Sequence, residues 1–301
     1  MAPRDIFLAV LITFVWGLNF VVIHIGIDAF PPLMFSALRF IFAAFPLIFL
    51  LPKPATNWRY ICGIGLILGV VKFALLFVGM HIGLSAGLAS IILQSQAFFT
   101  VLLVAIVFKE TPGFNQVVGI VIAFSGIAII VFTLDGKVTV VGLLMVLAAG
   151  FAWAVSNLLM KKAGTVDMLA LMVWISVVPP VPLIMLSLWL EGWRANAVAF
   201  AALDVSGLGA IGYIAYLATI LGFAGWGRLI RLYGAGRVAP FSLLVPVFGM
   251  GSSAFFLGEQ FEALRLSAVV LVFVGLAVTL MKPKAVRLGK TRPNRTIFKG
   301  Q

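Results

Sequence analysis

Hydrophobic residues along this chain gather in long runs, and short polar segments separate one run from the next. A membrane-spanning helix needs roughly 20 apolar residues, because the hydrocarbon core is about 30 Å thick and a helix rises about 1.5 Å per residue. The pattern therefore predicts ten spanning helices. They lie near 6–27, 31–51, 59–80, 86–108, 115–134, 139–160, 168–190, 205–227, 237–258 and 263–281.

Positive charge in the loops predicts the orientation of these helices. An even number of spans puts both ends on one side of the membrane. With the first residue inside, the inner loops hold nine basic residues and the outer loops three. Lys and Arg concentrate in cytoplasmic loops, so both termini are predicted to be cytoplasmic. Arg4 and the apolar run after it resemble a signal peptide, but no small-residue cleavage site follows, so we expect a retained first span.

Two stretches of the chain align with each other without a gap. They are "GLASIILQSQAFFTVLLVAIVFKE" and "GRVAPFSLLVPVFGMGSSAFFLGE". The alignment pairs Gly87 with Gly236, Phe99 with Phe248, Glu110 with Glu259, Phe124 with Phe273 and Gly126 with Gly275. Nearer the start, "FVWGLNF" resembles "FAWAVSN" at a slightly smaller offset, which pairs Trp16 with Trp153.

This internal similarity predicts two five-helix repeats, at 1–135 and 136–281, followed by a basic cytoplasmic tail at 282–301. Because five is odd, the second repeat enters the membrane from the opposite side. Inverted repeats are a transporter architecture, with a solute site near the midplane where the halves meet. Two inverted copies can exchange conformations, which converts an inward-open shape into an outward-open one. The expected fold class is thus an all-α integral membrane protein of ten helices that works by alternating access.

Composition agrees with a membrane and argues against a nucleic-acid partner. The chain is 63% hydrophobic and 10% charged, whereas soluble domains are nearer half and a quarter. The net charge is +12, but seven of the 21 Lys and Arg lie in the basic tail, which is typical of an anchor on anionic lipids. We expect contact with membrane lipids and a monomer or weak homo-oligomer. The single cysteine, Cys62, is expected to be a small buried hydrophobe.

Lys72 and Arg39 are the basic residues deepest within the predicted spans. They lie at a similar depth, and all nine carboxylates fall at helix ends or in loops, so no side-chain counter-ion is expected beside them. A cation within a span costs about 2.5–3.5 kcal/mol. One interpretation is that these residues face a water-filled cavity and attract a substrate carboxylate. The alternative is that they cap helix-end carbonyls or extend toward the outer interface.

Polar and aromatic residues in the equivalent spans are further candidates for substrate binding. Trp16 and Asn19 lie one helical turn apart on one face, and Trp153 and Asn157 occupy the matching span. An indole beside an amide suits a zwitterion, because the indole packs on carbon and the amide bonds an ammonium or a carboxylate. Buried amides also hydrogen-bond between membrane helices as structural contacts, so both interpretations stay open.

The fourth, eighth and ninth spans add candidates with less symmetry. Gln94 and Gln96 alternate along the helix, so at most one of them faces the pathway. Pro246 within a span frees a backbone carbonyl and permits a kink, which could act as a gate or be plain structure. Tyr213 and Tyr216 could add hydroxyl groups to the cavity.

What is missing narrows the function. No phosphate-binding loop, metal cluster or reactive dyad is present, so we expect no cofactor, no metal and no enzymatic activity. His24 and His81 lie near the predicted outer surface, where either could relay protons or be a polar end group. Because the spans lack carboxylates, we expect a facilitator driven mainly by the gradient of the solute.

Four stretches together resemble the EamA-type drug/metabolite transporter family. They are "VWGLNFVVIHIG", "PPLMFSALRFIFAAFP", "GLASIILQSQAFFT" and "RVAPFSLLVPVFG". The resemblance implies a ten-helix bundle in which the first four helices of each repeat enclose the pathway. It also implies export of small amino acids and related metabolites, of the cysteine and O-acetylserine kind, from the bacterial inner membrane. The alternatives are a permease for a nucleobase, a sugar derivative or a drug-like compound, and a lipid scramblase.

Overall fold

Every regular element in the described part of the chain is a helix. The computed structural model describes residues 1–109, 111–132, 139–164 and 166–280. The first half contains α1 (Pro3–Ala29), α2 (Pro32–Ala44), η1 (Leu47–Phe49), α3 (Trp58–Ile64), η2 (Gly65–Lys72), α4 (Phe73–His81), α5 (Ala86–Ile92), α6 (Ser95–Phe108) and α7 (Phe114–Phe132). The second half contains α8 (Val140–Ala163), α9 (Met168–Ile175), α10 (Pro180–Leu190), α11 (Trp193–Ala201), α12 (Val205–Gly212), η3 (Tyr213–Leu221), α13 (Gly222–Tyr233), α14 (Ala235–Val238), η4 (Ala239–Leu243), α15 (Leu244–Leu257) and α16 (Ala263–Leu280).

Eight of the described helices, counted across their short interruptions, are long and apolar enough to cross a membrane. They are Pro3–Ala29, Pro32–Phe49, Trp58–His81, Ala86–Phe108, Val140–Ala163, Met168–Leu190, Val205–Tyr233 and Ala239–Leu257. The fifth and tenth predicted spans correspond to shorter apolar helices, Phe114–Ile130 and Leu266–Thr279. The chain is therefore a multi-pass membrane protein whose described part is all-helical, and the count of ten spans stays a prediction.

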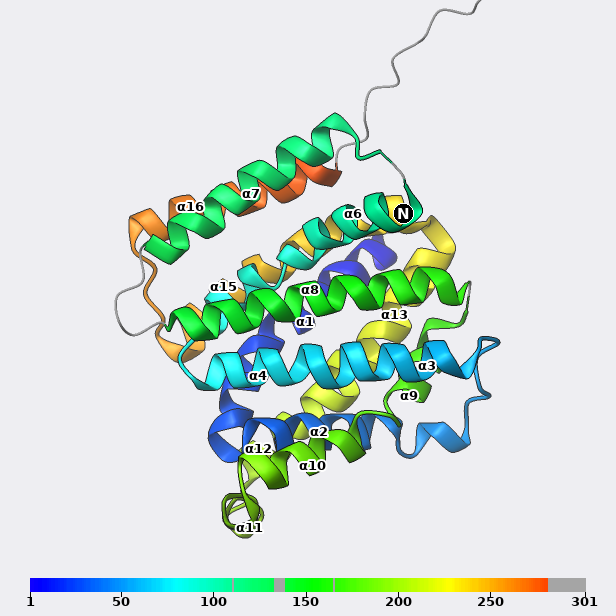
Figure 1. Ribbon diagram of the computed structural model, residues 1–301, viewed down its shortest axis with the longest axis vertical. Helices are drawn as coiled ribbons and strands as arrows, with labels where there is room; N and C mark the ends of the chain where they lie inside the picture. Colours follow the sequence, from blue (N-terminus) through cyan, green and yellow to red (C-terminus); the bar gives the residue numbers. More distant parts are fainter. Residues whose placement is uncertain (110, 133–138, 165, 281–301) are drawn as a thin grey trace, which may run out of the picture.

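Helices α7 and α16 lie side by side along one edge of the bundle, and α2, α10 and α11 lie toward the opposite edge (Figure 1). Glycines bring α7 and α16 together: a Cβ atom on Gly275 would lie 2.5 Å from the carbonyl oxygen of Gly119. A Cβ atom on Gly119 would lie 2.4 Å from the carbonyl oxygen of Gly275. Small residues allow this backbone-to-backbone approach, which gives membrane helices much of their packing energy.

Several spans are interrupted in the interior of the bundle. The spans 58–81 and 205–233 each contain a π-helical segment, η2 and η3. The span 86–108 breaks between Ile92 and Ser95, and the span 239–257 begins with the 3₁₀ segment η4. The side-chain amide of Gln94, in the break between α5 and α6, donates to the backbone carbonyl of Ser242 in η4 at 3.3 Å. Pro246 is the third residue of α15, directly after η4.

The exposure of Cys62 differs from the expectation. This residue lies on α3 and is exposed, not buried. In a membrane protein both the core and the lipid-facing surface are apolar, so hydrophobic neighbours in the sequence do not distinguish the two environments. The prediction of a buried cysteine was wrong for that reason.

Two carboxylates from the second half of the chain accept hydrogen bonds from the N-termini of helices in the first half. The backbone N–H groups of Leu33 and Met34 donate to Glu191 at 2.7 and 3.3 Å, at the start of α2. The N–H groups of Ala86 and Gly87 donate to Glu259, the first at 2.8 Å, at the start of α5. Negative charge stabilises a helix N-terminus, where N–H groups lack internal partners. We call the end of the bundle that carries both carboxylates the Glu191 end.

We expect Glu259→Ala to destabilise the protein, because two N–H groups of α5 lose their acceptor. Loss of such a cap costs about 1 kcal/mol. The control is Glu262→Ala, which removes an exposed carboxylate nearby in the same connection. Thermal unfolding in detergent should show a lower midpoint for the Glu259 variant alone, and equal midpoints for both variants would contradict the capping role.

We expect Gly275→Ala to loosen the contact between α7 and α16. The new methyl group has no space beside Gly119, and overpacking costs about 1–3 kcal/mol. Gly251→Ala is the matched control, because a Cβ atom on Gly251 meets nothing within 4 Å. The same unfolding assay should show destabilisation for Gly275→Ala and none for Gly251→Ala; a stable Gly275 variant would disprove the close approach.

Candidate functional site

Two buried cations meet at one aromatic ring. Lys72 ends the π-helical segment η2, and Phe73 begins α4. The Lys72 ammonium lies 3.3 Å from the centroid of the Phe73 ring, and the guanidinium carbon of Arg39 lies 4.0 Å from the same centroid. Both residues are only 4% exposed. The two basic residues that stand out in the sequence are thus brought together by the fold.

The second half of the chain contacts both cations. The Lys72 ammonium lies 4.8 Å from the ring centroid of Trp153 on α8. The Arg39 guanidinium donates from Nε and Nη2 to the hydroxyl oxygen of Thr219 on η3, at 3.2 and 2.9 Å. The pair therefore lies where the two halves touch.

Neither cation has a carboxylate partner among the described residues. Nη1 of Arg39 is buried, and no described residue accepts from it. Within the same described residues, the interactions of Lys72 are its contacts with the rings of Phe73 and Trp153. Cation–π contacts contribute about 0.5–2 kcal/mol, which offsets part of the cost of burying a cation in a membrane. Mutual repulsion adds to that cost. The arrangement can accept an anion, because both cations keep donors that no described residue uses.

The π-helical segment η3 explains how Thr219 reaches Arg39. A π turn leaves backbone carbonyls without their usual α-helical donor. The Thr219 hydroxyl donates to the carbonyl of Ile214 at 2.7 Å, five residues back, and its oxygen is then free to accept from Arg39. The indole N–H of Trp16 donates to the carbonyl of Ala218 at 2.8 Å.

These bonds bear on the two interpretations of the aromatic candidates. The N–H of Trp16 is used between helices, which favours the structural interpretation for that donor. Tyr213 likewise donates from its hydroxyl to the carbonyl of Val15 at 2.8 Å. Tyr216 is 40% exposed, and the structure does not bring it to the cations. Asn19 is buried, and its side-chain oxygen has no partner among the described residues.

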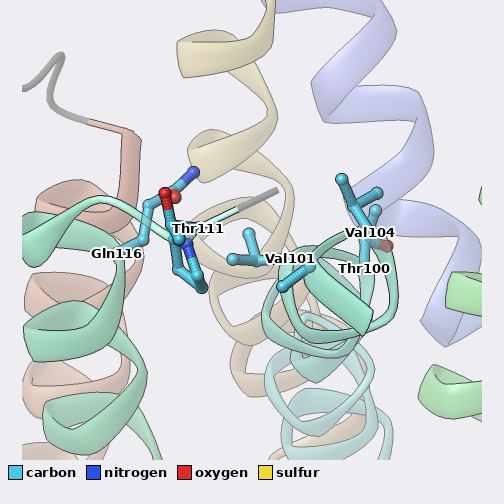
Figure 2. Close-up of a pocket in the computed structure, with 7 residues that line it drawn as sticks. Thr100, Val101, Val104, Thr111 and Gln116 are labelled. Carbon is cyan, nitrogen blue, oxygen red and sulfur yellow. The ribbon is translucent and has the colours of Figure 1, made fainter. Parts of the chain in front are cut away.

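An uncharged polar cluster connects α6 and α8. The Asn157 amide donates to the side-chain oxygen of Gln96 at 2.9 Å and to the hydroxyl of Thr100 at 3.1 Å. Thr100 also lines a hollow of about 230 Å³ with Val101, Val104, Thr111 and Gln116 (Figure 2). Gln94 bonds to Ser242 instead, so the two glutamines do point apart. Asn157 links the two halves of the chain here.

Histidines and possible metal ligands lie away from the cation pair. The imidazole Nε2 of His24 lies 4.0 Å from the Asp28 carboxylate, and its buried Nδ1 has no partner in the described part of the chain. His81 lines a hollow at the Glu191 end. Within the described ranges, no three side chains of the types that ligate metals gather in one place.

Phe73 and Thr219 are contributors that sequence reasoning missed. Phe73 is one of 27 phenylalanines and carries no pattern that separates it from the rest. Thr219 reaches Arg39 because of the π turn, and helical spacing in the sequence assumes an α-helix. The position of Phe73 directly after a lysine within a span was the one sequence feature that pointed to it.

Comparison with known proteins shows where this architecture belongs. A model of the EamA-like transporter family matches residues 4–132 and again residues 140–281. A Salmonella typhimurium protein named probable amino-acid metabolite efflux pump is 40% identical over 286 residues, which cover 93% of this chain and 96% of the relative. An Escherichia coli protein of the same name is 38% identical over 298 residues, which cover 96% and 100%.

A solved crystal structure resembles this fold with a TM-score of 0.61 at 15% identity, covering 92% of this chain and 96% of the other. That likeness concerns the fold alone. The family model, by contrast, matches once in each half, and its two matches together cover nearly the whole chain. On these grounds the chain belongs to the EamA-like transporter family.

Proposed function

We propose that this protein exports zwitterionic amino acids and related metabolites, of the cysteine and O-acetylserine kind, across the bacterial inner membrane. The observation that carries the proposal is the buried pair of Arg39 and Lys72 on the Phe73 ring. A substrate carboxylate between the cations would accept charge-assisted hydrogen bonds from both and relieve their repulsion.

Membership of a transporter family already fixes the general class. The predictions that the chain is a transporter and not an enzyme are confirmed by the family and by relatives named as efflux pumps. A transporter of this family moves a small-molecule substrate. The two relatives are named probable amino-acid metabolite efflux pumps, which supports amino-acid metabolites as the substrate of this chain.

Alternating access between two inverted five-helix repeats, 1–135 and 136–281, is part of the proposal, as are ten spans with cytoplasmic termini. Equivalent irregularities in the two halves support it. The π-helical segments η2 and η3 begin at Gly65 and Tyr213, a separation that matches the Gly87–Gly236 alignment to within one residue. The break at Gln94 and the segment η4 are also equivalent, and they contact each other.

The cation pair sits where such a rearrangement would act. Lys72 belongs to a π turn in one half and touches Trp153 of the other, while Arg39 is held by the π segment of the other half. Changing between π and α hydrogen bonding would rotate the side chains that follow the turn. Export would then be driven by the gradient of the solute, because none of the described carboxylates pairs with the cations.

We expect Lys72→Met to abolish most solute exchange, because the carboxylate loses one of its two cations. A loss of at least about 1.4 kcal/mol in substrate binding corresponds to about tenfold. The measurement is counterflow of labelled cysteine and O-acetylserine in proteoliposomes. The control is Lys53→Met, which makes the same change at an exposed lysine. Equal exchange by wild type and Lys72→Met would return Lys72 to a structural role.

Thr219→Val should weaken substrate binding several-fold, while Thr219→Ser should keep it. The hydroxyl positions Arg39 by accepting from Nε and Nη2, and serine retains it whereas valine keeps only the shape. The concentration of O-acetylserine that gives half-maximal counterflow should rise for valine alone. Equal values for both variants would show that this hydrogen bond does not position the guanidinium for substrate.

A further inference from the structure

A hollow of about 880 Å³ opens at the Glu191 end of the bundle, away from the cation pair. Its wall includes Phe30, His81 and the charged residues Asp28, Glu191 and Arg194. Glu191 is occupied by the N-terminus of α2. Arg194 and Asp28 therefore give the hollow a cation and a carboxylate, the two charges that a zwitterion needs.

A ladder of phenylalanine rings connects this hollow to the cations. Phe73 contacts Phe77 on α4 with ring centroids 5.7 Å apart, and Phe77 contacts Phe35 on α2 at 5.5 Å. Phe35 stacks on Phe30 at 6.3 Å. Phe73 carries both cations, and Phe30 lines the hollow. The four rings thus span the whole distance between the two places.

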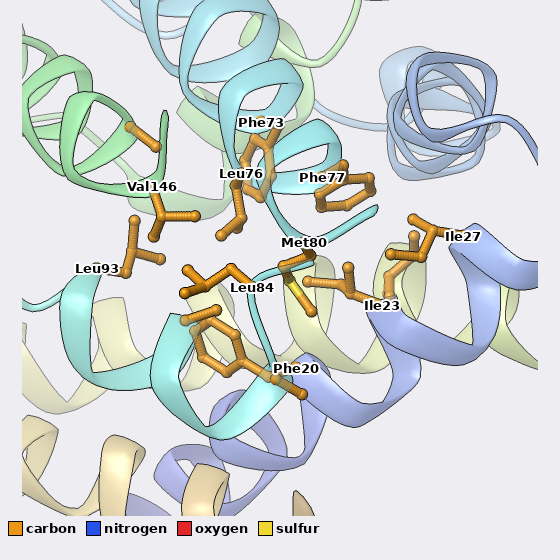
Figure 3. Packing of buried hydrophobic residues seen from close by; sticks show 14 of the residues in the cluster. Phe20, Ile23, Ile27, Phe73, Leu76, Phe77, Met80, Leu84, Leu93 and Val146 are labelled. Atoms are coloured by element: carbon orange, nitrogen blue, oxygen red, sulfur yellow. The ribbon is translucent and has the colours of Figure 1, made fainter. Parts of the chain in front are cut away.

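The four rings of the ladder are buried and closely packed. Phe30, Phe35 and Phe77 are at most 2% exposed, and Phe73 is 7% exposed. A Cβ atom on Gly26 would lie 2.0 Å from the tip of the Phe35 ring, so α1 leaves the space that this ring fills. Figure 3 shows Phe77 on α4 on the side of Ile23 and Ile27 of α1, with Phe73 farther from them on the same helix. A zwitterion cannot pass such a layer without losing its hydration, which is costly.

We propose that the hollow is the exit site of the transport route, and that Phe73, Phe77, Phe35 and Phe30 form the barrier between it and the cation pair. The proposal rests on the proposed function, in which the cations bind the substrate carboxylate. Arg194 takes that carboxylate at the exit site, and Asp28 takes the ammonium group. The predicted topology places this end of the bundle outside the cell.

The barrier is tested by thiol labelling, which needs no transport. In a Cys62→Ser background, Lys72→Cys places a thiol at the cation site. A charged, membrane-impermeant methanethiosulfonate reagent is added outside spheroplasts. We expect Phe77→Ala to raise the labelling rate at position 72 at least tenfold. Phe98→Ala is the matched control, because Phe98 is equally buried but packs in a separate cluster with Phe124.

A milder variant guards against misfolding. Phe77→Leu keeps an apolar side chain and removes the ring, and it should raise labelling about threefold. Correct folding is checked by size-exclusion chromatography. Labelling that stays slow in both folded Phe77 variants would overturn the barrier, and so would equal acceleration by Phe98→Ala.

The exit site is tested by the direction of transport. With Arg194→Gln, we expect the half-saturating O-acetylserine concentration to rise about tenfold for solute presented at the Glu191 end and to stay unchanged for solute presented at the other end. Arg59→Gln, at an exposed position on α3, is the control. A shift for both directions, or for neither, would overturn the exit site. If counterflow fails while Phe77→Ala accelerates labelling, the barrier stands and the substrate assignment falls.

Discussion

The Phe73 ring carries Lys72 and Arg39 within 4.0 Å of its centroid, in the interior of an apolar bundle and without a carboxylate partner among the described residues. Such a group of charges is costly in a membrane. The rings of Phe73 and Trp153 and the hydroxyl of Thr219 offset part of that cost. An anionic group on the substrate would offset the remaining cost of burying the two cations. Substrate binding would therefore also stabilise the folded protein.

The irregular helices follow from the same constraint. A straight α-helix bonds its carbonyls internally, and it offers nothing to a neighbour. The π turn in η3 frees carbonyls that the Thr219 hydroxyl and the Trp16 indole satisfy, and Thr219 in turn holds Arg39. Irregular backbone within a membrane is tolerated where protein side chains satisfy it. The equivalent π turn in η2 ends at Lys72, so both cations depend on these distortions.

Much of the fold could be predicted because a helix that crosses a membrane needs a long run of apolar residues, which is visible in the sequence. Apolar length gave the positions of the helices, and the isolated charges of Lys72 and Arg39 drew attention because nothing nearby neutralised them. The π turns have no sequence signature, so the link from Arg39 to Thr219 could not be predicted. The exposure of Cys62 and the capping by Glu191 and Glu259 could not be predicted either, because each depends on how the helices pack against one another.

The ladder of phenylalanine rings could not be predicted from the sequence for a similar reason. Helical spacing indicates that Phe73 and Phe77 share a face. The packing of α2 against α4 adds Phe35, and Phe30, at the end of α1, joins them by stacking on Phe35. A route from the cations to the Glu191 end therefore emerges from contacts between helices. Its chemistry is consistent along its length: charged groups at both ends and a dry aromatic layer between them.

The central claim is that the cation pair binds a substrate carboxylate, and the most direct measurement compares ligands that differ in that group alone. Binding of cysteine and of cysteamine, which lacks the carboxylate, can be followed on the purified protein by isothermal titration calorimetry. We expect cysteine to bind at least about tenfold more tightly than cysteamine, because a charge-assisted contact contributes about 1.5–3 kcal/mol. Equal affinity for the two ligands would contradict it.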